Sequence, residues 1–169
     1  MSNPTPMSPV LLSRYLGQQY PPTDQQAAVI GAEPGPLLVV AGAGAGKTET
    51  MAARVVWLVA NGYARPDEVL GLTFTRKAAQ EMGKRIRDRL GSLAANTDLV
   101  HRLDPSGELA DNLQVIAPSV STYDSYAGEL IREYGLLVPV EPDARLITDA
   151  ELHAIATDVV VNYSGGLIT

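Results

Sequence analysis

Residues 41–48 (AGAGAGKT) alternate alanine with glycine and end in a lysine and a threonine. Small residues let a backbone curl closely around a phosphate chain with its N–H groups turned inward. In such loops a lysine lies near the β- and γ-phosphates, and a hydroxyl side chain ligates magnesium. The residues predicted to bind nucleotide phosphates are Ala41, Gly42, Ala43, Gly44, Ala45, Gly46, Lys47 and Thr48, with Lys47 and Thr48 as candidates for catalysis and Thr48 as the metal ligand. The strict pattern begins with glycine where this chain has Ala41, a variant that occurs in such loops. The alternative is a plain glycine–alanine turn between a strand and a helix.

A second set of residues combines an aromatic ring with hydroxyls and positive charges. Phe74, the only phenylalanine of the chain, is followed by Thr75, Arg76 and Lys77. An aromatic ring can stack on an unpaired base while cations and hydroxyls reach phosphates, and this combination binds single strands without sequence preference. The alternative is a core phenylalanine beside ordinary solvated charges. The basic residues that follow are expected mainly on a solvated helix face, with a role in holding DNA left open: Lys84, Arg85, Arg87 and Arg89.

These residues need a scaffold that places them at the ends of buried strands. Residues 37–41 (LLVVA) form an unbroken apolar run, which is typical of a strand buried on both faces of a parallel sheet. Residues 96–114 are polar and are expected to be irregular. Further strands are predicted over residues 68–74 and 117–122, and helices over residues 11–19, 23–31, 47–60, 76–95, 123–135 and 149–161. This alternation predicts an α/β fold with a mostly parallel sheet.

Charge is unevenly distributed along the chain. The 169 residues carry a net charge of −6, which argues at first sight against a nucleic-acid partner. However, six of the 13 basic residues fall within residues 76–89, where an anion-binding face is therefore expected. The absence of cysteine excludes disulfides and thiolate metal sites and is typical of a cytoplasmic protein. No secretory signal and no run of about 18 apolar residues is present, so no membrane partner is predicted.

We expect structural roles for four other polar residues. His101 and His153 are far apart in sequence and have no spacing that suggests a metal site or a catalytic triad. Asp124 and Asp149 are each expected to cap the N-terminus of a helix. Residues 145–149 (RLITD) imitate a Walker B strand that ends in an acid, but their apolar run is too short for that role.

Four segments in a fixed order carry a resemblance to a known family. PTDQQAAV (residues 22–29) precedes GPLLVVAGAGAGKT (35–48), and GLTFTRKAAQEM (71–82) and VSTYDSYA (120–127) follow. This series resembles the Q motif, Walker A, motif Ia and motif Ib of the UvrD/PcrA/RecB-like superfamily 1A DNA helicases. Residues 49–79 look particularly similar to actinobacterial AdnB-like helicase–nuclease subunits, which process broken DNA ends.

The resemblance implies a P-loop (RecA-like) three-layer fold that binds ATP and Mg²⁺ and contacts single-stranded DNA. By position Gln25 is the Q-motif glutamine that recognises adenine, and its amide has the donor and the acceptor that this requires. Two positions depart from the family. Glu49 stands where an arginine often faces the nucleotide, and Asp124 stands where a histidine is usual. The resemblance places the following residues at DNA: Thr73, Phe74, Thr75, Arg76, Lys77, Thr122 and Tyr123.

The resemblance also implies a domain organisation. Residues 1–20 are expected to form a flexible tail and a short helix, residues 21–135 part of motor domain 1A, and residues 136–169 the start of a helical, 1B-like insertion. Walker B and the later motifs are not found in these 169 residues. We therefore expect the chain to be the N-terminal part of an ATP-dependent DNA helicase or translocase that acts in recombination or repair. Alone, it is expected to be unable to hydrolyse ATP.

The implied partners are single-stranded DNA and motor domain 2A, and a second helicase–nuclease subunit is left open. Two other functions remain possible on the residues alone. One is a non-catalytic nucleotide-binding or interaction module, and the other is an unrelated P-loop kinase. A kinase, however, has no use for Phe74 beside Arg76 and Lys77.

Overall fold

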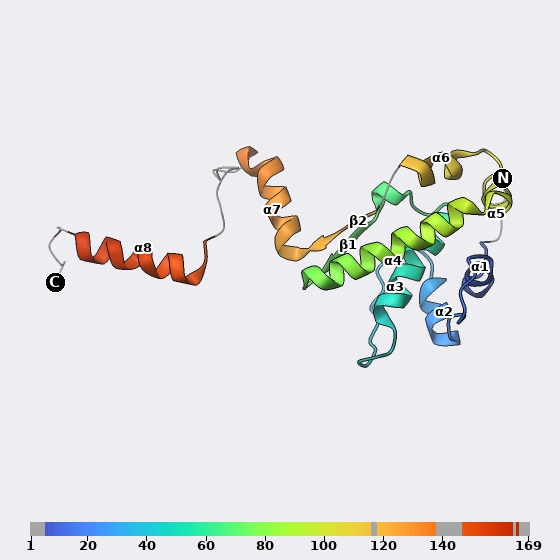
Figure 1. The fold of residues 1–169 in the computed structure, drawn as a ribbon, viewed down its shortest axis with the longest axis horizontal. Coiled ribbons are helices and arrows are strands. Elements are labelled where there is room, and N and C mark those ends of the chain that lie inside the picture. The colour runs from blue at the N-terminus through green and yellow to red at the C-terminus, as the bar shows by residue number, and fades with distance from the viewer. Residues whose placement is uncertain (1–5, 116–117, 138–146, 164, 166–169) are drawn as a thin grey trace. The chain divides into compact units, whose positions relative to one another are not determined.

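The computed structural model describes residues 6–115, 118–137, 147–163 and 165. The chain divides into two compact units, residues 1–126 and 127–169, and each is described by itself. The first unit contains α1 (Pro9–Tyr15), α2 (Asp24–Ile30), α3 (Lys47–Ala60), a 3₁₀ helix (Pro66–Glu68), β1 (Leu70–Thr73), α4 (Arg76–Ala95), α5 (Thr97–Leu103), α6 (Glu108–Val115) and β2 (Ser119–Thr122) (Figure 1). α7 (Tyr123–Tyr134) begins in the first unit and ends in the second, which also contains a 3₁₀ helix (Gly135–Leu137) and α8 (Asp149–Asn162).

The core of the first unit lies between α3 and α4, whose predicted bounds are confirmed. α4 buries a stripe at helical spacing that consists of Ala79, Met82, Ile86, Leu90 and Leu93. α3 packs against it through Ala52, Val56 and Val59, all of which are almost fully buried. This apolar contact holds together the helix that begins at the end of the predicted phosphate-binding loop (residues 41–48, called the phosphate loop below) and the helix that follows β1.

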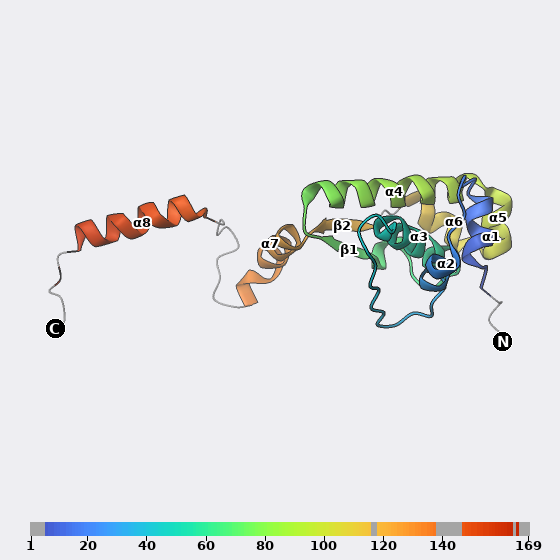
Figure 2. The same ribbon diagram turned by 90° about the horizontal axis from the view of Figure 1, so that it is seen from below.

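β1 and β2 form a parallel pair, with Leu70 opposite Ser119 and Thr73 opposite Thr122. α4 packs against one face of this pair (Figure 2). Gly71 leaves room for side chains of both neighbours, because a Cβ at this position would lie 3.2 Å from Val120 Cγ2 of β2 and 3.4 Å from Met82 Sδ of α4. The predicted parallel arrangement of these two strands is therefore confirmed.

The prediction of a strand over residues 37–41 is wrong. These residues form no strand, and Leu38 and Val40 are 89% and 88% exposed. Figure 2 shows the segment between α2 and α3 extending away from the helices. An extended segment is stabilised as a strand only by backbone hydrogen bonds to a neighbour. Within the described part of the chain, β1 and β2 pair only with each other and offer residues 37–41 none.

The prediction that residues 96–114 are irregular is also wrong, because α5 and part of α6 lie in this range. Asn96 caps α5 by accepting a hydrogen bond from the Leu99 N–H at 3.1 Å. Leu99, Val100 and Leu109 are buried in the core of the first unit. Short helices of this kind present too few apolar residues for a clear period, and their burial against α4 decides their conformation.

α1 is docked on α3 by the residues that precede it. The Trp57 Nε1–H donates to the Met7 carbonyl at 2.6 Å, and the Met7 N–H donates to Asn61 Oδ1 at 2.6 Å. Leu12 of α1 is buried among the core residues. The short helix predicted near the N-terminus is therefore packed on the same helix that begins at the phosphate loop.

In the second unit, α8 begins at a threonine cap. The Thr148 hydroxyl accepts a hydrogen bond from the Glu151 N–H at 3.3 Å, and the Glu151 carboxylate accepts one from the Thr148 N–H at 2.8 Å. The prediction that Asp149 is the cap is wrong by one residue, because this reciprocal pair needs a glutamate three residues after the cap. In the described residues, no helix has both the length and the hydropathy needed to span a bilayer.

Candidate nucleotide site and nucleic-acid interface

The phosphate loop ends at the first residue of α3. Gly44 and Gly46 have φ angles of +78° and +75°, in the left-handed region that glycine adopts without a side-chain clash. Gly46 is the N-cap of α3, so the free N–H groups of the first helical turn follow directly after the loop. Such a helix end attracts anions. The local backbone therefore presents Lys47 and Thr48 where phosphates bind favourably.

The Lys47 ammonium group is held by its own loop. Nζ donates to the carbonyl oxygen of Ala41 at 3.0 Å and to that of Gly42 at 2.6 Å. These bonds join the start of the loop to the first residue of α3. A lysine has three donors, so one N–H remains for a phosphate oxygen even while both carbonyls are bound.

Thr48 fits the role of a magnesium ligand. Its side chain is half-buried in the first turn of α3, and its hydroxyl makes no hydrogen bond to any residue that the structure describes. Mg²⁺ prefers hard oxygen ligands and keeps several of its waters, so one protein hydroxyl beside nucleotide phosphates suffices. Elsewhere in the described part of the chain, no group of three or more acidic or histidine side chains could hold a metal, and His101 and His153 form no site.

The helix that carries Gln25 is bound to the phosphate loop through Gln26. Gln26 Nε2 donates to the Ala45 carbonyl at 3.3 Å, while its Oε1 accepts from the Thr23 N–H at 3.0 Å. Gln25 itself is exposed and lines a cavity of about 570 Å³ together with Lys47. The predicted adenine-reading glutamine and the predicted phosphate-binding lysine thus share one cavity.

Sequence reasoning missed two residues that position α2. One of them is Gln26. Thr23 and Gln26 have the spacing of a capping box, and this signal could have identified Gln26. Arg54 of α3 is the other, and no sequence signal pointed to it. Its guanidinium donates to four carbonyls at the end of α2, those of Val29 at 2.8 Å, Ile30 at 3.1 Å, Ala32 at 2.9 Å and Glu33 at 3.3 Å. Arg54 in this way binds the last residues of α2 and the segment that follows them to α3.

The two predicted DNA-contacting motifs meet at the carboxyl ends of β1 and β2. Thr73 and Thr122 are register partners, and both are buried. The next residue of each strand is aromatic, and the Phe74 and Tyr123 ring centroids lie 5.2 Å apart with an interplanar angle of 40°. Phe74 is 89% exposed and Tyr123 is 50% exposed. The parallel register therefore brings two aromatic rings together on the surface.

Hydroxyl caps start both helices that follow the strands. Thr75 accepts a hydrogen bond at 3.2 Å from the N–H three residues ahead, and Thr122 does the same at 3.2 Å. The prediction that Asp124 is a cap is thus wrong, because Thr122 fills that position and Asp124 lies in the first turn of α7. Arg76 and Lys77 are exposed in the first turn of α4, and only Thr75 separates them from Phe74.

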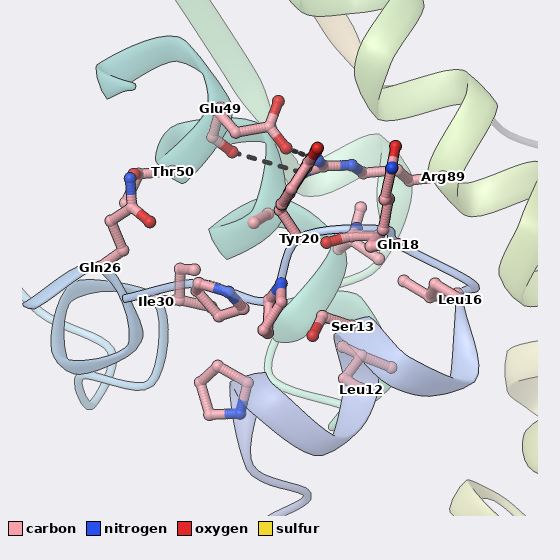
Figure 3. Close-up of a pocket in the computed structure, with 16 residues that line it drawn as sticks. Leu12, Ser13, Leu16, Gln18, Tyr20, Gln26, Ile30, Glu49, Thr50 and Arg89 are labelled. Carbon is pink, nitrogen blue, oxygen red and sulfur yellow. Dashed lines mark hydrogen bonds and ion pairs between the residues drawn. The ribbon is translucent and has the colours of Figure 1, made fainter. Parts of the chain in front are cut away.

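Glu49, in the first turn of α3, is paired with two arginines of α4. Arg85 Nη1 lies 2.8 Å from Glu49 Oε2, Arg89 forms an ion pair with the other carboxylate oxygen, and Arg89 Nη1 donates to the Glu49 carbonyl at 3.3 Å. The Glu49–Arg89 pair lines a pocket to which Tyr20, Gln26 and Thr50 also contribute (Figure 3). Burial lowers the pKa of Arg89 from its usual value, although arginine remains protonated at neutral pH. The prediction of a solvated face is therefore wrong for Arg89, whose side chain is 15% exposed, whereas Arg85 is exposed as predicted but is ion-paired.

The sequence matches the profile of the UvrD/REP helicase N-terminal domain over residues 22–164. DNA helicase IV of Escherichia coli (strain K12) is 54% identical over 66 residues, which are 39% of this chain and 10% of that protein. An ATP-dependent helicase/nuclease subunit of Listeria monocytogenes is 35% identical over 144 residues, or 83% of this chain and 11% of that protein. ATP-dependent DNA helicase UvrD2 of Mycobacterium tuberculosis is 48% identical over 64 residues, or 38% and 9%. The chain thus spans about a tenth of the length of these relatives, and it belongs to the UvrD/REP helicase N-terminal domain family.

Proposed function

We propose that the chain is the N-terminal ATP-binding part of an ATP-dependent helicase or translocase that acts on single-stranded DNA in recombination or repair. Membership of the UvrD/REP helicase N-terminal domain family supports this function. The observation that carries it is the pairing of Phe74 with Tyr123 at the ends of two parallel strands, in the same unit as a phosphate loop. A nucleotide kinase has no need of such a surface.

In the nucleotide half of the site, Lys47 neutralises the β- and γ-phosphates and the Thr48 hydroxyl ligates Mg²⁺. The N–H groups at the start of α3 add hydrogen bonds to the phosphate oxygens. Gln25 hydrogen-bonds adenine with its amide, and its place on the cavity that Lys47 also lines supports this role. Magnesium, when bound, offsets the phosphate charge that develops during transfer.

In the DNA half, Phe74 and Tyr123 stack on unpaired bases, and Arg76 and Lys77 bind the backbone phosphates. Stacking on both rings would hold a single strand without reading its sequence. Thr73, Thr75 and Thr122 belong to the same proposed DNA surface. Thr75 is exposed, Thr73 and Thr122 are buried, and each hydroxyl is engaged in a hydrogen bond within the chain.

Turnover needs more than these residues provide. ATP hydrolysis requires an acid on magnesium, a group that positions water and an arginine from a second motor domain. The acid that directly follows Thr48 is Glu49, which is already paired with Arg85 and Arg89. We assign the missing groups to residues outside this chain, including motor domain 2A, and infer that the chain binds ATP without hydrolysing it.

Three finer features belong to the same proposal. The complete domain has the three-layer P-loop fold, which membership of the helicase family supports. A second helicase–nuclease protein is a partner, on the analogy of the Listeria relative, whose name describes it as one subunit of a helicase/nuclease. The cell compartment is the cytoplasm, which suits a chain without cysteine.

The test measures three properties of the purified chain. We expect binding of ATP in calorimetry, binding of fluorescein-labelled oligothymidylate in anisotropy, and no ATPase activity with or without that DNA. ATP binding without DNA binding would favour a nucleotide-binding module, and phosphoryl transfer to a small acceptor would favour a kinase. Robust DNA-stimulated hydrolysis by the chain alone would contradict the assignment of the missing groups to other residues.

A further inference from the structure

The charge next to the phosphate loop is set by residues from two helices. Glu49 directly follows Lys47 and Thr48 in the first turn of α3, where phosphates are proposed to bind. It lines a pocket that shares Gln26 and Thr50 with the cavity proposed for the nucleotide. A lone carboxylate there would repel a polyphosphate. Arg85 and Arg89, one helical turn apart on α4, both reach this carboxylate, and the cluster of the three side chains carries a formal charge of +1.

We propose that Arg85 and Arg89 are positioning residues of the nucleotide site, supplied by α4, which reverse the charge that Glu49 places beside the phosphate loop and thereby set its affinity for polyphosphates. This inference rests on the proposed nucleotide site. Among the described residues, the cluster is the only ion-paired link between α3 and α4.

The geometry favours a fixed cluster over a passing surface contact. The Arg89 side chain is only 15% exposed, compared with 43% for Glu49 and 47% for Arg85. Arg89 also donates to the Glu49 backbone carbonyl, so it is anchored to the backbone of α3 as well as to the carboxylate. In Figure 3 the Arg89 and Glu49 side chains point toward one another, and dashed lines mark their contacts. The positive charges are therefore held at the start of α3.

An effect of charge and an effect of structure predict different ATP affinities for variants in which Glu49 or Arg85 is replaced by glutamine. Arg85→Gln lowers the charge of the cluster to zero and keeps Arg89 in place. Glu49→Gln raises it to +2 and breaks the same ion pair. The double variant Glu49→Gln/Arg85→Gln also lacks the pair but has the wild-type charge of +1. Arg87→Gln is the matched control, because Arg87 is exposed on the same helix and forms no ion pair with the described residues.

The test is calorimetric titration of the full chain with ATP and with AMP in the presence of Mg²⁺ at low salt. We expect Arg85→Gln to weaken ATP binding by roughly three- to tenfold and AMP binding by less, since the effect follows ligand charge. The loss should shrink at high salt, where charges are screened. Glu49→Gln should bind ATP at least as tightly as the wild type. The double variant should return to within about twofold of it, because its cluster charge is unchanged.

Other results would overturn the inference. Equal losses in Arg85→Gln and Arg87→Gln would mean that only the overall charge matters. If Arg85→Gln, Glu49→Gln and the double variant all bound ATP more weakly than the wild type, the ion pair would act through structure alone. If the wild type bound ATP and Arg85→Gln bound it with the same affinity, this inference would be wrong and the proposed function would stand. If the wild-type chain bound no ATP, both would fall.

Discussion

The rings of Phe74 and Tyr123, which follow register partners on two parallel strands, lie 5.2 Å apart on the surface of the first unit. The two residues are distant in sequence, and each belongs to a separate motif. Their proximity follows from the register of β1 and β2, which places Thr73 opposite Thr122. A small exposed aromatic surface therefore exists before any ligand binds.

Replacing Phe74 with alanine should weaken binding of oligothymidylate by about 1–3 kcal/mol, the usual value of one stacked base. Phe74→Trp should retain most of the affinity, because the stacking surface remains. The measurement is fluorescence anisotropy, with thermal melting to confirm folding. Since Phe74 is 89% exposed, its loss should hardly change stability. Equal DNA affinity for Phe74→Ala and the wild type would contradict the proposed interface.

Phe74 and Tyr123 should act together on DNA. A double-mutant cycle with Phe74→Ala and Tyr123→Ala should give a coupling energy of about 0.5–1.5 kcal/mol, because the two tilted rings contact each other. The same cycle with Phe74→Ala and Tyr63→Ala is the control, since Tyr63 stacks instead on Trp57. Strict additivity for the first pair would indicate that the rings act separately.

Lys47→Ala should abolish measurable ATP binding, because the cation that neutralises the β- and γ-phosphates is lost. The two carbonyls that Lys47 contacts lie on exposed residues, Ala41 and Gly42, and they can bond to water instead. The melting temperature should therefore change little. Calorimetric titration with ATP tests the first statement and thermal melting the second. Unchanged ATP affinity would rule out the loop as the phosphate site.

Arg54→Ala should destabilise the first unit by about 1–3 kcal/mol, because several carbonyls at the end of α2 lose a charged donor. Arg54→Lys should recover only part of this loss, since an ammonium group lacks the planar fork of the guanidinium. Urea unfolding measures both values, with Arg87→Gln as the control. ATP affinity should fall in parallel, because α2 carries Gln25 to the cavity. Full stability of Arg54→Ala would contradict this positioning role.

Asp104 should make the first unit more stable near neutral pH than in acid. The Ser106 hydroxyl and the Leu109 N–H donate to its carboxylate at 2.5 and 2.8 Å, and these bonds lower the pKa of Asp104 below its usual value of 3.8. A carboxyl whose pKa is lowered by folding stabilises the folded state above its unfolded pKa, and that contribution is lost as the pH falls through the lower folded value.

Asp104→Ala should therefore cost about 0.5–2 kcal/mol at pH 7, in the range of a lost helix cap. The difference in unfolding free energy between the wild type and Asp104→Asn should shrink between pH 6 and pH 3. Urea unfolding at several pH values measures it, with Asp98→Asn as a control for general charge effects. A difference that is constant across this range would mean that the Asp104 carboxylate makes no special contribution.

Some of the fold could be predicted from local pattern. The bounds of α3 and α4 follow from a glycine or threonine cap and a long apolar stripe, which are local signals. Residues 37–41 did not follow the pattern, because a strand depends on a neighbour that local sequence cannot specify. The caps at Thr122 and Thr148 were each missed in favour of a nearby aspartate, since which side chain reaches the free N–H groups depends on the backbone at the helix start.

By itself, the sequence determined the chemistry that is available: a glycine-rich loop with a lysine and a threonine, an aromatic residue before a basic helix, and four ordered motifs of one helicase family. Tertiary structure alone decided which of these residues are neighbours. The register of β1 and β2 paired Phe74 with Tyr123, and the packing of α3 on α4 brought Arg85 and Arg89 to Glu49. Spacing along the chain reports the turn of one helix or strand, whereas contacts between elements depend on how their buried faces fit together.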